Sequence, residues 1–390
     1  MPPTQNPANP GETPIETALD RYFHSLDAGG SENTLRYVLR DGTESFHSFL
    51  AENGITTVEQ ITTDTCRDWG YELRERTDND EIAASTAHNY FAYTRAFLEF
   101  CKRDGLLTTN PAEPDRTQEY LPEDTGDRDR QFWGERDRKA IIQYVTKRAD
   151  EALNDDPNTS LEPAYRDRVL VYLLTLTGAR GAELFRDPHD EKRNGLRWTD
   201  VDFDAGTITV LGKSRSWETI GLTEESRPGY PATQPPLERW YNRVQSPPID
   251  DWPVFPTGHT PSKREALVDA LGEAETAGLL EEMTVDEALR ETEVAPPAIS
   301  KNGARSLMKR LCDDAGLDID GEYLKPHGAR RGLGHTLYEQ GEIVNAQGLL
   351  RHASIRTTHE SYSDIQAKQV AENTADAVSG ASQPSDTEEE

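Results

Sequence analysis

The chain has 390 residues, with 42 Lys and Arg against 71 Asp and Glu, and its formal net charge is −29 at pH 7. A chain of this length suits two domains with terminal tails rather than one domain. The charge excludes a general coat that binds nucleic acid or membrane, so any basic binding surface must be local. An acidic surface also stays hydrated in strong salt, which screens long-range repulsion, so the composition predicts a salt-adapted, halophilic host.

The cysteines and the apolar segments indicate the expected compartment. Cys66, Cys101 and Cys312 form no CxxC pair, which predicts buried free thiols rather than metal ligands or disulfides. The sequence shows no signal peptide and no apolar run of about 18 residues. We therefore expect a cytoplasmic protein that makes no membrane contact.

Residues 15–112 are expected to form a helical domain. Apolar residues recur there near a period of 3.6 in four segments, 15–26, 33–54, 66–76 and 85–106. Ser85 is the expected cap of the last helix. Residues 1–14 and the acidic residues 371–390 are expected to be disordered tails, and the polar residues 113–130 a linker.

Residues 131–370 are expected to form a second domain, also mainly α. Residues 163–178 form the most apolar helix of the chain and must be central in a core. Residues 197–222 alternate apolar and polar side chains around turn residues, which predicts a small antiparallel β-sheet. Residues 260–297 are expected to be an acidic helical insertion without residues suited to chemistry.

Two basic residues in the first part of this domain could carry chemistry. Arg180 follows the apolar helix and Glu183 lies three residues on, a pairing that helix-dipole compensation also explains. Lys213 stands in "LGKS", but Gly206 and Gly212 are separated by five residues, whereas a phosphate-binding loop requires four. Nucleotide binding is therefore rejected, and Lys213 is expected at the tip of a hairpin, either solvated or reaching across a cleft.

The stretch "KPHGARRGLGH", residues 325–335, concentrates cations within an acidic chain. His327 and Arg330 are spaced i, i+3 and share one face at the start of a helix. Pro326 suits the first helical position, where free N–H groups favour anions. Further on, His352 is followed ten residues later by Tyr362. Taken alone, a single tyrosine near the C-terminus is typically an amphipathic surface residue.

Together these residues suit phosphoryl transfer. Two arginines, two histidines and a lysine can stabilise a crowded anionic phosphate transition state without a metal, and a tyrosine can act as an oxygen nucleophile. We therefore expect neither a metal nor another cofactor.

At this point the sequence resembles the tyrosine recombinase (phage integrase, Xer-like) family. The resemblance rests on "TGARGAEL", "GKSRSWETIGL", "HGARRG", "LLRHASIRTT" and the tyrosine that follows, in that order. It covers the catalytic half, about residues 135–370, and implies that residues 15–112 are a helical core DNA-binding domain.

The resemblance also implies a role for each residue. Arg180 and Arg330 would clamp the scissile phosphate, His352 would hydrogen-bond it, and Glu183 would buttress the pocket. His327 would accept the proton of Tyr362, which would attack to give a 3′-phosphotyrosine. Lys213 would protonate the leaving 5′ oxygen. Arg331 and His335 are expected to serve packing or backbone contacts.

Three departures from the family pattern stand out. The usual Leu-Gly-His is Leu350-Arg351-His352, and residues 186–196 lengthen the gap before the hairpin. The interval from His352 to Tyr362 is one residue longer than the commonest one. The extra residue indicates either a bulge or a tyrosine donated to a neighbouring protomer, and His359 and Ser361 are the other nearby candidate nucleophiles.

We therefore expect a site-specific recombinase that clamps double-stranded DNA with two domains and acts as a homotetramer on paired sites. Two alternatives are kept, a relaxing topoisomerase of type IB-like chemistry and a non-catalytic DNA-binding regulator that kept the fold. The intact set of Arg180, Lys213, His327, Arg330, His352 and Tyr362 argues against the regulator.

Overall fold

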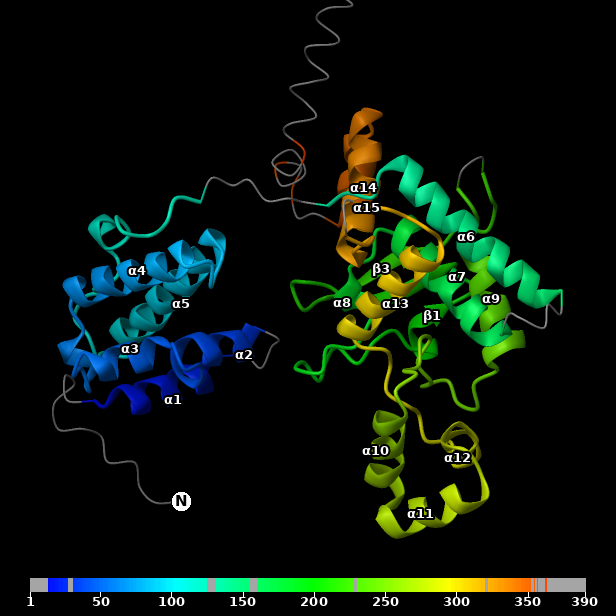
Figure 1. The fold of residues 1–390 in the computed structure, drawn as a ribbon, viewed down its shortest axis with the longest axis horizontal. Helices are drawn as coiled ribbons and strands as arrows, with labels where there is room; N and C mark the ends of the chain where they lie inside the picture. The colour runs from blue at the N-terminus through cyan, green and yellow to red at the C-terminus, as the bar shows by residue number, and fades with distance from the viewer. Residues whose placement is uncertain are drawn as a thin grey trace, which may run out of the picture. The chain divides into compact units, whose positions relative to one another are not determined.

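We describe the fold from a computed structural model of the chain. The structure describes residues 13–26, 31–124, 131–154, 160–227, 230–319, 322–351, 354, 356 and 362. The chain divides into two compact units, unit 1 (Met1–Asp129) and unit 2 (Arg130–Glu390) (Figure 1). Each unit has its own hydrophobic core. The expected tails, 1–14 and 371–390, lie outside the described residues except for Thr13 and Pro14, and Thr13 is buried.

Unit 1 is helical over its described residues. Its helices are α1 (Ile15–Ser25), α2 (Ser31–Arg36), α3 (Phe46–Glu52), α4 (Thr63–Asp78) and α5 (Ala84–Arg103). Each longer helix is amphipathic, and the apolar faces meet in one core in which Leu19, Trp69 and Phe97 are almost fully buried.

Two local expectations for unit 1 are wrong. Residues 33–54 do not form one helix, because the chain passes through a π-helical turn at Tyr37–Asp41 and leaves the helix at Gly42. Ser45 then caps α3 by accepting a hydrogen bond from the amide of Ser48 at 3.2 Å. Ser85 lies inside α5, which starts after Ala83 without a side-chain cap.

The packing of unit 1 continues beyond residue 112. The side-chain oxygen of Asn110 accepts a hydrogen bond from the amide of Ala112 at 3.0 Å and turns the chain back towards the helices. Thr117 and Leu121 are then buried against the core. The segment 113–130, expected as a linker, thus begins as part of the unit 1 core.

Unit 2 confirms the predicted fold class, mainly α with a small antiparallel sheet. Its described helices are α6 (Glu135–Leu153), α7 (Leu161–Leu176), α8 (Gly181–Leu184), α9 (Gln234–Arg239), α10 (Thr260–Leu271), α11 (Glu273–Glu282), α12 (Val285–Glu291), α13 (Lys301–Asp314), α14 (Pro326–Glu339) and α15 (Ile343–Leu350). The sheet runs in the order β1 (Val201–Asp202), β2 (Thr207–Leu211) and β3 (Trp217–Gly221), with both pairs antiparallel.

Helix α7 is the centre of the unit 2 core, as predicted from its apolar sequence. Nearly all of its residues from Val169 onwards are buried, and α6 lies along it (Figure 1). The buried carboxylate of Asp167 is paired with Arg148 at 2.9 Å, Arg166 at 2.7 Å and Arg310 at 3.0 Å. These pairs supply the partners that a buried charge requires.

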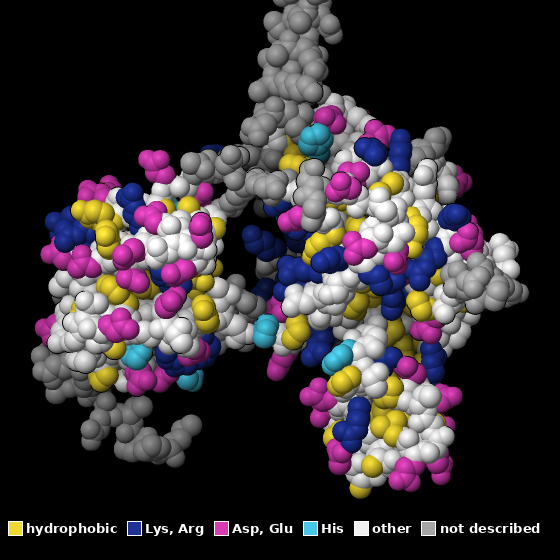
Figure 2. Space-filling view, viewed as in Figure 1, with side chains coloured by type: hydrophobic (Ala, Val, Ile, Leu, Met, Phe, Trp, Pro, Cys, Tyr) yellow, Lys and Arg dark blue, Asp and Glu magenta, His cyan; other side chains and the backbone are white. Residues whose placement is uncertain are grey.

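Helices α10, α11 and α12 form a projection on a narrow stem (Figure 1). The amide of Thr257 donates to the carbonyl of Pro297 at 2.9 Å, and Pro256 and Ala298 form an antiparallel bridge. The two ends of the projection are therefore joined to each other where it meets the rest of unit 2. Nine Asp and Glu stand against three Lys and Arg between residues 260 and 291, and acidic side chains dot this projection in Figure 2.

The remaining general expectations concern thiols and membrane segments. Cys66, Cys101 and Cys312 are free and buried, as predicted, and burial raises the pKa of Cys66 to about 12. In the described part of the chain, no helix is both long and apolar enough to cross a membrane.

Candidate active site

Arg180 is held at the junction between α7 and α8. After α7, Gly178 adopts a φ of 66°, a left-handed conformation that turns the chain away from the helix axis. Arg180 therefore follows the apolar helix, as the sequence indicated, and is the residue directly before α8. Its Nη1 donates to Oε1 of Glu183 at 2.7 Å, and its amide donates to Oε2 at 2.7 Å.

Glu183 is a fully paired buried carboxylate. Its burial favours the neutral acid, but the amide of Arg180 and the charges of Arg351 and Arg180 outweigh burial and lower the pKa of Glu183 below its ordinary value. Glu183 therefore stays ionised and holds the guanidinium of Arg180 in one orientation.

The start of α14 is anchored by Trp133, which the sequence did not single out. The indole Nε1 of Trp133 donates to the carbonyl of Lys325 at 2.8 Å, and its amide donates to the carbonyl of Gly328 at 3.2 Å. A Cβ at Gly328 would lie 2.8 Å from the indole, and one at Gly332 would collide with the Trp133 backbone. The glycines of the cationic stretch thus allow a close approach that places His327 and Arg330.

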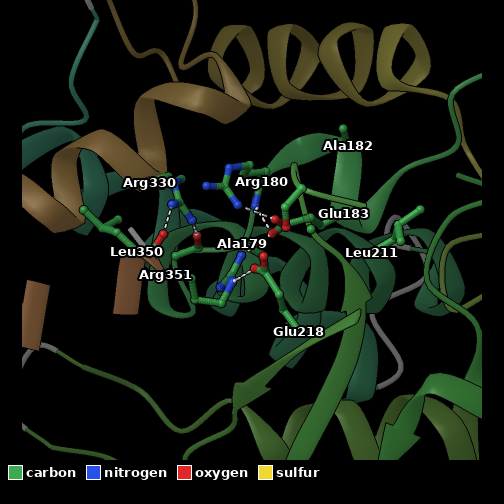
Figure 3. Close-up of polar contacts among 12 residues, drawn as sticks. Ala179, Arg180, Ala182, Glu183, Leu211, Glu218, Arg330, Leu350 and Arg351 are labelled. Carbon is green, nitrogen blue, oxygen red and sulfur yellow. Dashed lines mark hydrogen bonds and ion pairs between the residues drawn. The ribbon is translucent and has the colours of Figure 1, made fainter. Parts of the chain in front are cut away.

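Arg330 is buried and lies beside Arg180 (Figure 3). Its Nη1 donates to the carbonyl of Gly178, and its Nη2 donates to the carbonyl of Leu350. Burial and the positive charges of Arg180 and Arg351 lower the pKa of Arg330 to about 9, so the guanidinium is still charged at neutral pH. Two of its five N–H donors are used by these carbonyls, which leaves others for a ligand.

His327 lies at the exposed first turn of α14. Partial loss of hydration and the charges of Arg331, Arg330 and Arg180 lower the pKa of His327 to about 4. Its ring is therefore neutral at physiological pH and able to accept a proton. A bound anion beside these arginines would raise that pKa towards its ordinary value.

Lys213 lies at the tip of the β2–β3 hairpin, where the sequence placed it, and is exposed. Among the residues that the structure describes, its ammonium group makes no hydrogen bond or ion pair. Arg193 holds the base of this turn by donating to the carbonyls of Leu211 at 2.8 Å and Gly212 at 2.7 Å. Arg193 comes from the lengthened segment after α8 and was not predicted.

Tyr362 is buried against α14. Its hydroxyl lies 3.5 Å from the carbonyl of Arg331, and its ring lies 5.6 Å from that of Tyr338. A Cβ at Gly334 would collide with this hydroxyl. Burial raises the pKa of Tyr362, while the charges of Arg330 and Arg331 act in the opposite direction. His352, His359 and Ser361 lie outside the described residues.

The structure thus brings Arg180, Glu183 and Arg330 into one cluster, with the charges of Arg330 and Arg180 acting on His327. Lys213 stands on the neighbouring hairpin. His335 lies 3.3 Å from Glu339, and its ring is 5.4 Å from that of Phe132, contacts of the packing kind expected for it.

Arg351 is a further member of this cluster that the sequence did not assign. Its guanidinium pairs with Glu183 and with Glu218, the latter at 2.7 Å (Figure 3). The signal available from the sequence was an arginine in place of the usual glycine before His352, and it was read only as a departure.

The comparisons with known proteins point in one direction. No protein-family model matches the sequence. The chain is 22% identical over 347 residues to the tyrosine recombinase XerC of Oceanobacillus iheyensis, which covers 88% of this chain and 90% of that protein. It is 27% identical over 210 residues to the tyrosine recombinase XerD of Pseudomonas aeruginosa, which covers 53% of this chain and 60% of that protein.

Solved structures share the fold. XerH site-specific recombinase bound to a palindromic difH substrate, in a post-cleavage complex, matches 96% of this chain and 99% of that chain with a TM-score of 0.57 at 14% identity. A lambda integrase dimer bound to a COC′ core site matches 90% of this chain and 78% of that chain with a TM-score of 0.53 at 16% identity. The shared fold extends over both units.

Proposed function

We propose that the chain, which is similar to tyrosine recombinases and integrases, is a member of that family and acts as a site-specific DNA recombinase that forms a covalent 3′-phosphotyrosine. Its substrate is double-stranded DNA in the cytoplasm, and its reaction exchanges one phosphodiester for another. No nucleotide is needed, because the bond energy is conserved in the tyrosine ester.

Two residues transfer protons in the cleavage step, one as the base and one as the acid. The hydroxyl oxygen of Tyr362 attacks phosphorus while the bond from phosphorus to the 5′ oxygen breaks. His327 accepts the phenolic proton, and Lys213 donates a proton to the 5′ oxygen, which leaves as a hydroxyl group. Rejoining runs the same steps in reverse. His352 is proposed to hydrogen-bond the phosphate.

The observation that carries the proposal is the pair of fixed arginines. Arg330 is buried yet charged at neutral pH, and Arg180 beside it is locked by Glu183. Two preorganised guanidinium groups of this kind stabilise the negative charge that builds on non-bridging phosphate oxygens. In an acidic chain they form the local basic site that the composition required.

The position of Tyr362 adds one requirement to the mechanism. Its hydroxyl lies against the backbone of α14 at Arg331 rather than in contact with a guanidinium. Attack therefore requires this hydroxyl to turn towards Arg330, where the positive charges would lower its pKa and favour the phenolate.

The two units suggest a division of labour on DNA. We assign DNA binding without chemistry to unit 1 and strand cleavage to unit 2, so that the protein acts as a two-armed clamp. The acting species is proposed to be a homotetramer on paired sites. A lambda integrase tetramer bound to a Holliday junction shares the fold, with a TM-score of 0.53 and 15% identity.

A nicked suicide duplex tests the proposed nucleophile. Loss of a short strand after cleavage prevents rejoining, so the wild-type chain should accumulate a covalent adduct that survives acid. Tyr362→Phe should bind the same duplex without forming an adduct, whereas His359→Ala and Ser361→Ala should keep most of it. A covalent adduct with Tyr362→Phe would show that another residue attacks.

A plasmid assay with the same protein distinguishes recombination from simple relaxation of supercoils. On a plasmid with two target sites, a recombinase exchanges strands between the sites, whereas a topoisomerase only relaxes supercoils. Mixing inactive Tyr362→Phe with inactive Arg330→Ala chains reveals whether the tyrosine acts within its own protomer. Restored cleavage in the mixture would assign it to a neighbouring protomer.

A further inference from the structure

Arg351 adopts a backbone conformation that is unfavourable for an arginine. It caps the C-terminus of α15 with φ 48° and ψ 47°, in the left-handed region. An L-residue other than glycine pays about 1 kcal/mol or more there. Its side chain is nevertheless only 11% exposed, so it is held inside unit 2 rather than extended into solvent.

The buried guanidinium of Arg351 joins two carboxylates from distant parts of the chain. Its Nη2 donates to Oε2 of Glu183 on α8, and its Nε donates to Oε2 of Glu218 on β3 at 2.7 Å (Figure 3). The side chain of Glu183 is fully buried and that of Glu218 is 22% exposed. Both ion pairs are therefore shielded from solvent, which strengthens them.

Each carboxylate in turn touches a proposed catalytic element. The carboxylate of Glu183 also accepts hydrogen bonds from the guanidinium and from the backbone amide of Arg180. The carboxylate of Glu218 lies over Gly212 so closely that a Cβ at that position would collide with it. Gly212 directly precedes Lys213, so Glu218 rests on the turn that carries the proposed general acid.

The backbone next to Arg351 makes the third connection. The carbonyl of Leu350 accepts a hydrogen bond from Arg330. One residue thus stands where the end of α15, the buttress of Arg180 and the β2–β3 hairpin meet.

We propose that Arg351 is a positioning residue that sets the β2–β3 hairpin, through Glu218, so that Lys213 reaches the leaving 5′ oxygen. The inference rests on the proposed function, because it assigns Arg351 to the same strand-cleavage step. In this role Arg351 acts through Glu218 rather than on the DNA or the reacting atoms. Its ion pair with Glu218 links the end of α15 to the hairpin and restricts the backbone at that position.

Arg351→Gly is the central variant, because glycine suits the left-handed conformation and the fold should survive. We expect DNA affinity to stay the same and the first-order rate of cleavage on the suicide duplex to fall roughly 100-fold, the effect of about 1 Å of misplacement. Glu293→Gly is the matched control, since Glu293 also has a positive φ, of 57°, but lies beyond α12. Its cleavage rate should match that of the wild type.

A modified leaving group tests the route through Lys213. A duplex with sulfur in place of the scissile 5′ oxygen releases a thiolate, whose acid has a pKa of about 8.5 and needs no proton donor. This substrate should restore cleavage by Arg351→Gly and by Lys213→Ala but not by Arg330→Ala. Equal losses on the oxygen and sulfur substrates, or an unchanged rate on the oxygen substrate, would overturn the proposal.

A double-mutant cycle tests the link through Glu218. Glu218→Gln should slow cleavage of the oxygen substrate, and adding it to Arg351→Gly should cost little more, because both changes remove one interaction. Fully additive losses would contradict an action through Glu218.

Amide hydrogen exchange tests the same link between Arg351 and the hairpin and does not depend on DNA cleavage. The amide of Gly212 donates to the carbonyl of Ser216 at 2.8 Å across the hairpin turn. Arg351→Gly should speed exchange at residues 212–216 relative to Glu293→Gly. Unchanged exchange would refute the structural link even if the chain cleaves no DNA, whereas a wild-type chain that forms no adduct would refute only the proposed function.

Discussion

At the scale of single residues, Tyr362 lies directly against the backbone of α14 at Gly334. A methyl group at Gly334 would collide with the Tyr362 hydroxyl and lie 2.7 Å from Cδ1 of Leu350. Gly334→Ala should therefore displace the tyrosine and reduce adduct formation by about 10-fold or more, since even 1 Å of misplacement can cost 100-fold. The measurement is the adduct yield on the suicide duplex over time.

Gly348→Ala provides the control for that substitution. Gly348 lies within α15, and nothing stands within 4 Å of its potential Cβ. Both substitutions raise helix propensity by about 1 kcal/mol, but only the one at Gly334 meets the tyrosine. Equal adduct yields in the two variants would contradict the packing of Tyr362 against α14.

His327 gives a prediction about pH. Its pKa is lowered from 6.5 to about 4 in the folded chain, so between these values the unfolded chain binds a proton that the folded site refuses. This group therefore has no effect on stability above about pH 6.5 and destabilises the fold progressively as the pH falls towards 4. His327→Gln should remove that acid-dependent loss.

Chemical denaturation at several pH values measures this effect. The free energy of unfolding of His327→Gln, relative to the wild type, should rise between about pH 6.5 and 4 and stay level above that range. A difference that does not change with pH would mean that the arginines and partial burial do not suppress protonation of His327.

At the scale of secondary-structure elements, the projection α10–α12 joins the body of unit 2 through its stem and through side chains such as Leu267 and Leu289, which belong to the unit 2 core cluster. The stem is closed by the hydrogen bond between Thr257 and Pro297, and Arg290 fastens the projection by donating to the carbonyl of Gln245 at 2.8 Å. Replacing residues 258–296 by a short Gly- and Asn-containing turn should keep the fold and strand cleavage. The loss of the Arg290 contacts should cost about 1–3 kcal/mol of stability.

The melting temperature and the adduct yield of the shortened chain check this prediction. Arg290→Ala is the matched control, because it removes the same hydrogen bonds while leaving the projection in place. If the shortened chain folds but no longer cleaves DNA, the projection takes part in the reaction and is not an insertion of the expected kind.

The sequence predicted the element types well and the connections between them poorly. Periodicity identified α7 and the β2–β3 hairpin, because burial on all sides and strict alternation leave clear patterns. It merged α2 and α3, because Gly42 and Ser45 interrupt a pattern whose apolar spacing continues across them. Local patterns do not encode which distant partners a side chain meets.

The candidate site follows the same rule. Motif order indicated Arg180, Glu183 and Arg330, which the structure brings together. The ion pairs of Arg351 with Glu183 and Glu218 span more than 100 positions of sequence and leave no periodic signal. Their only trace was an arginine at a backbone position that favours glycine.

At the scale of the whole molecule, the basic site has to work within an acidic chain. Lys and Arg side chains gather on part of the visible face of unit 2, while acidic side chains spread over both units (Figure 2). Long-range repulsion from a formal charge of −29 opposes the approach of DNA, whereas the arginines of the site attract a phosphate at short range. Salt screens the first interaction more than the second, because the site is partly buried.

This balance predicts that the protein works best at high salt. Ordinary DNA-binding proteins lose affinity steeply as salt rises, because bound counterions are released from DNA. Here added KCl should first relieve repulsion within the chain and between the chain and DNA, so the melting temperature and the adduct yield should both rise from about 50 mM towards molar concentrations. Sucrose at equal osmolarity is the control, since it stabilises compact states without screening charge. A chain that is fully folded and active at about 50 mM KCl and loses adduct as salt is added would behave as an ordinary DNA-binding protein, and its acidic surface would then need an explanation other than adaptation to salt.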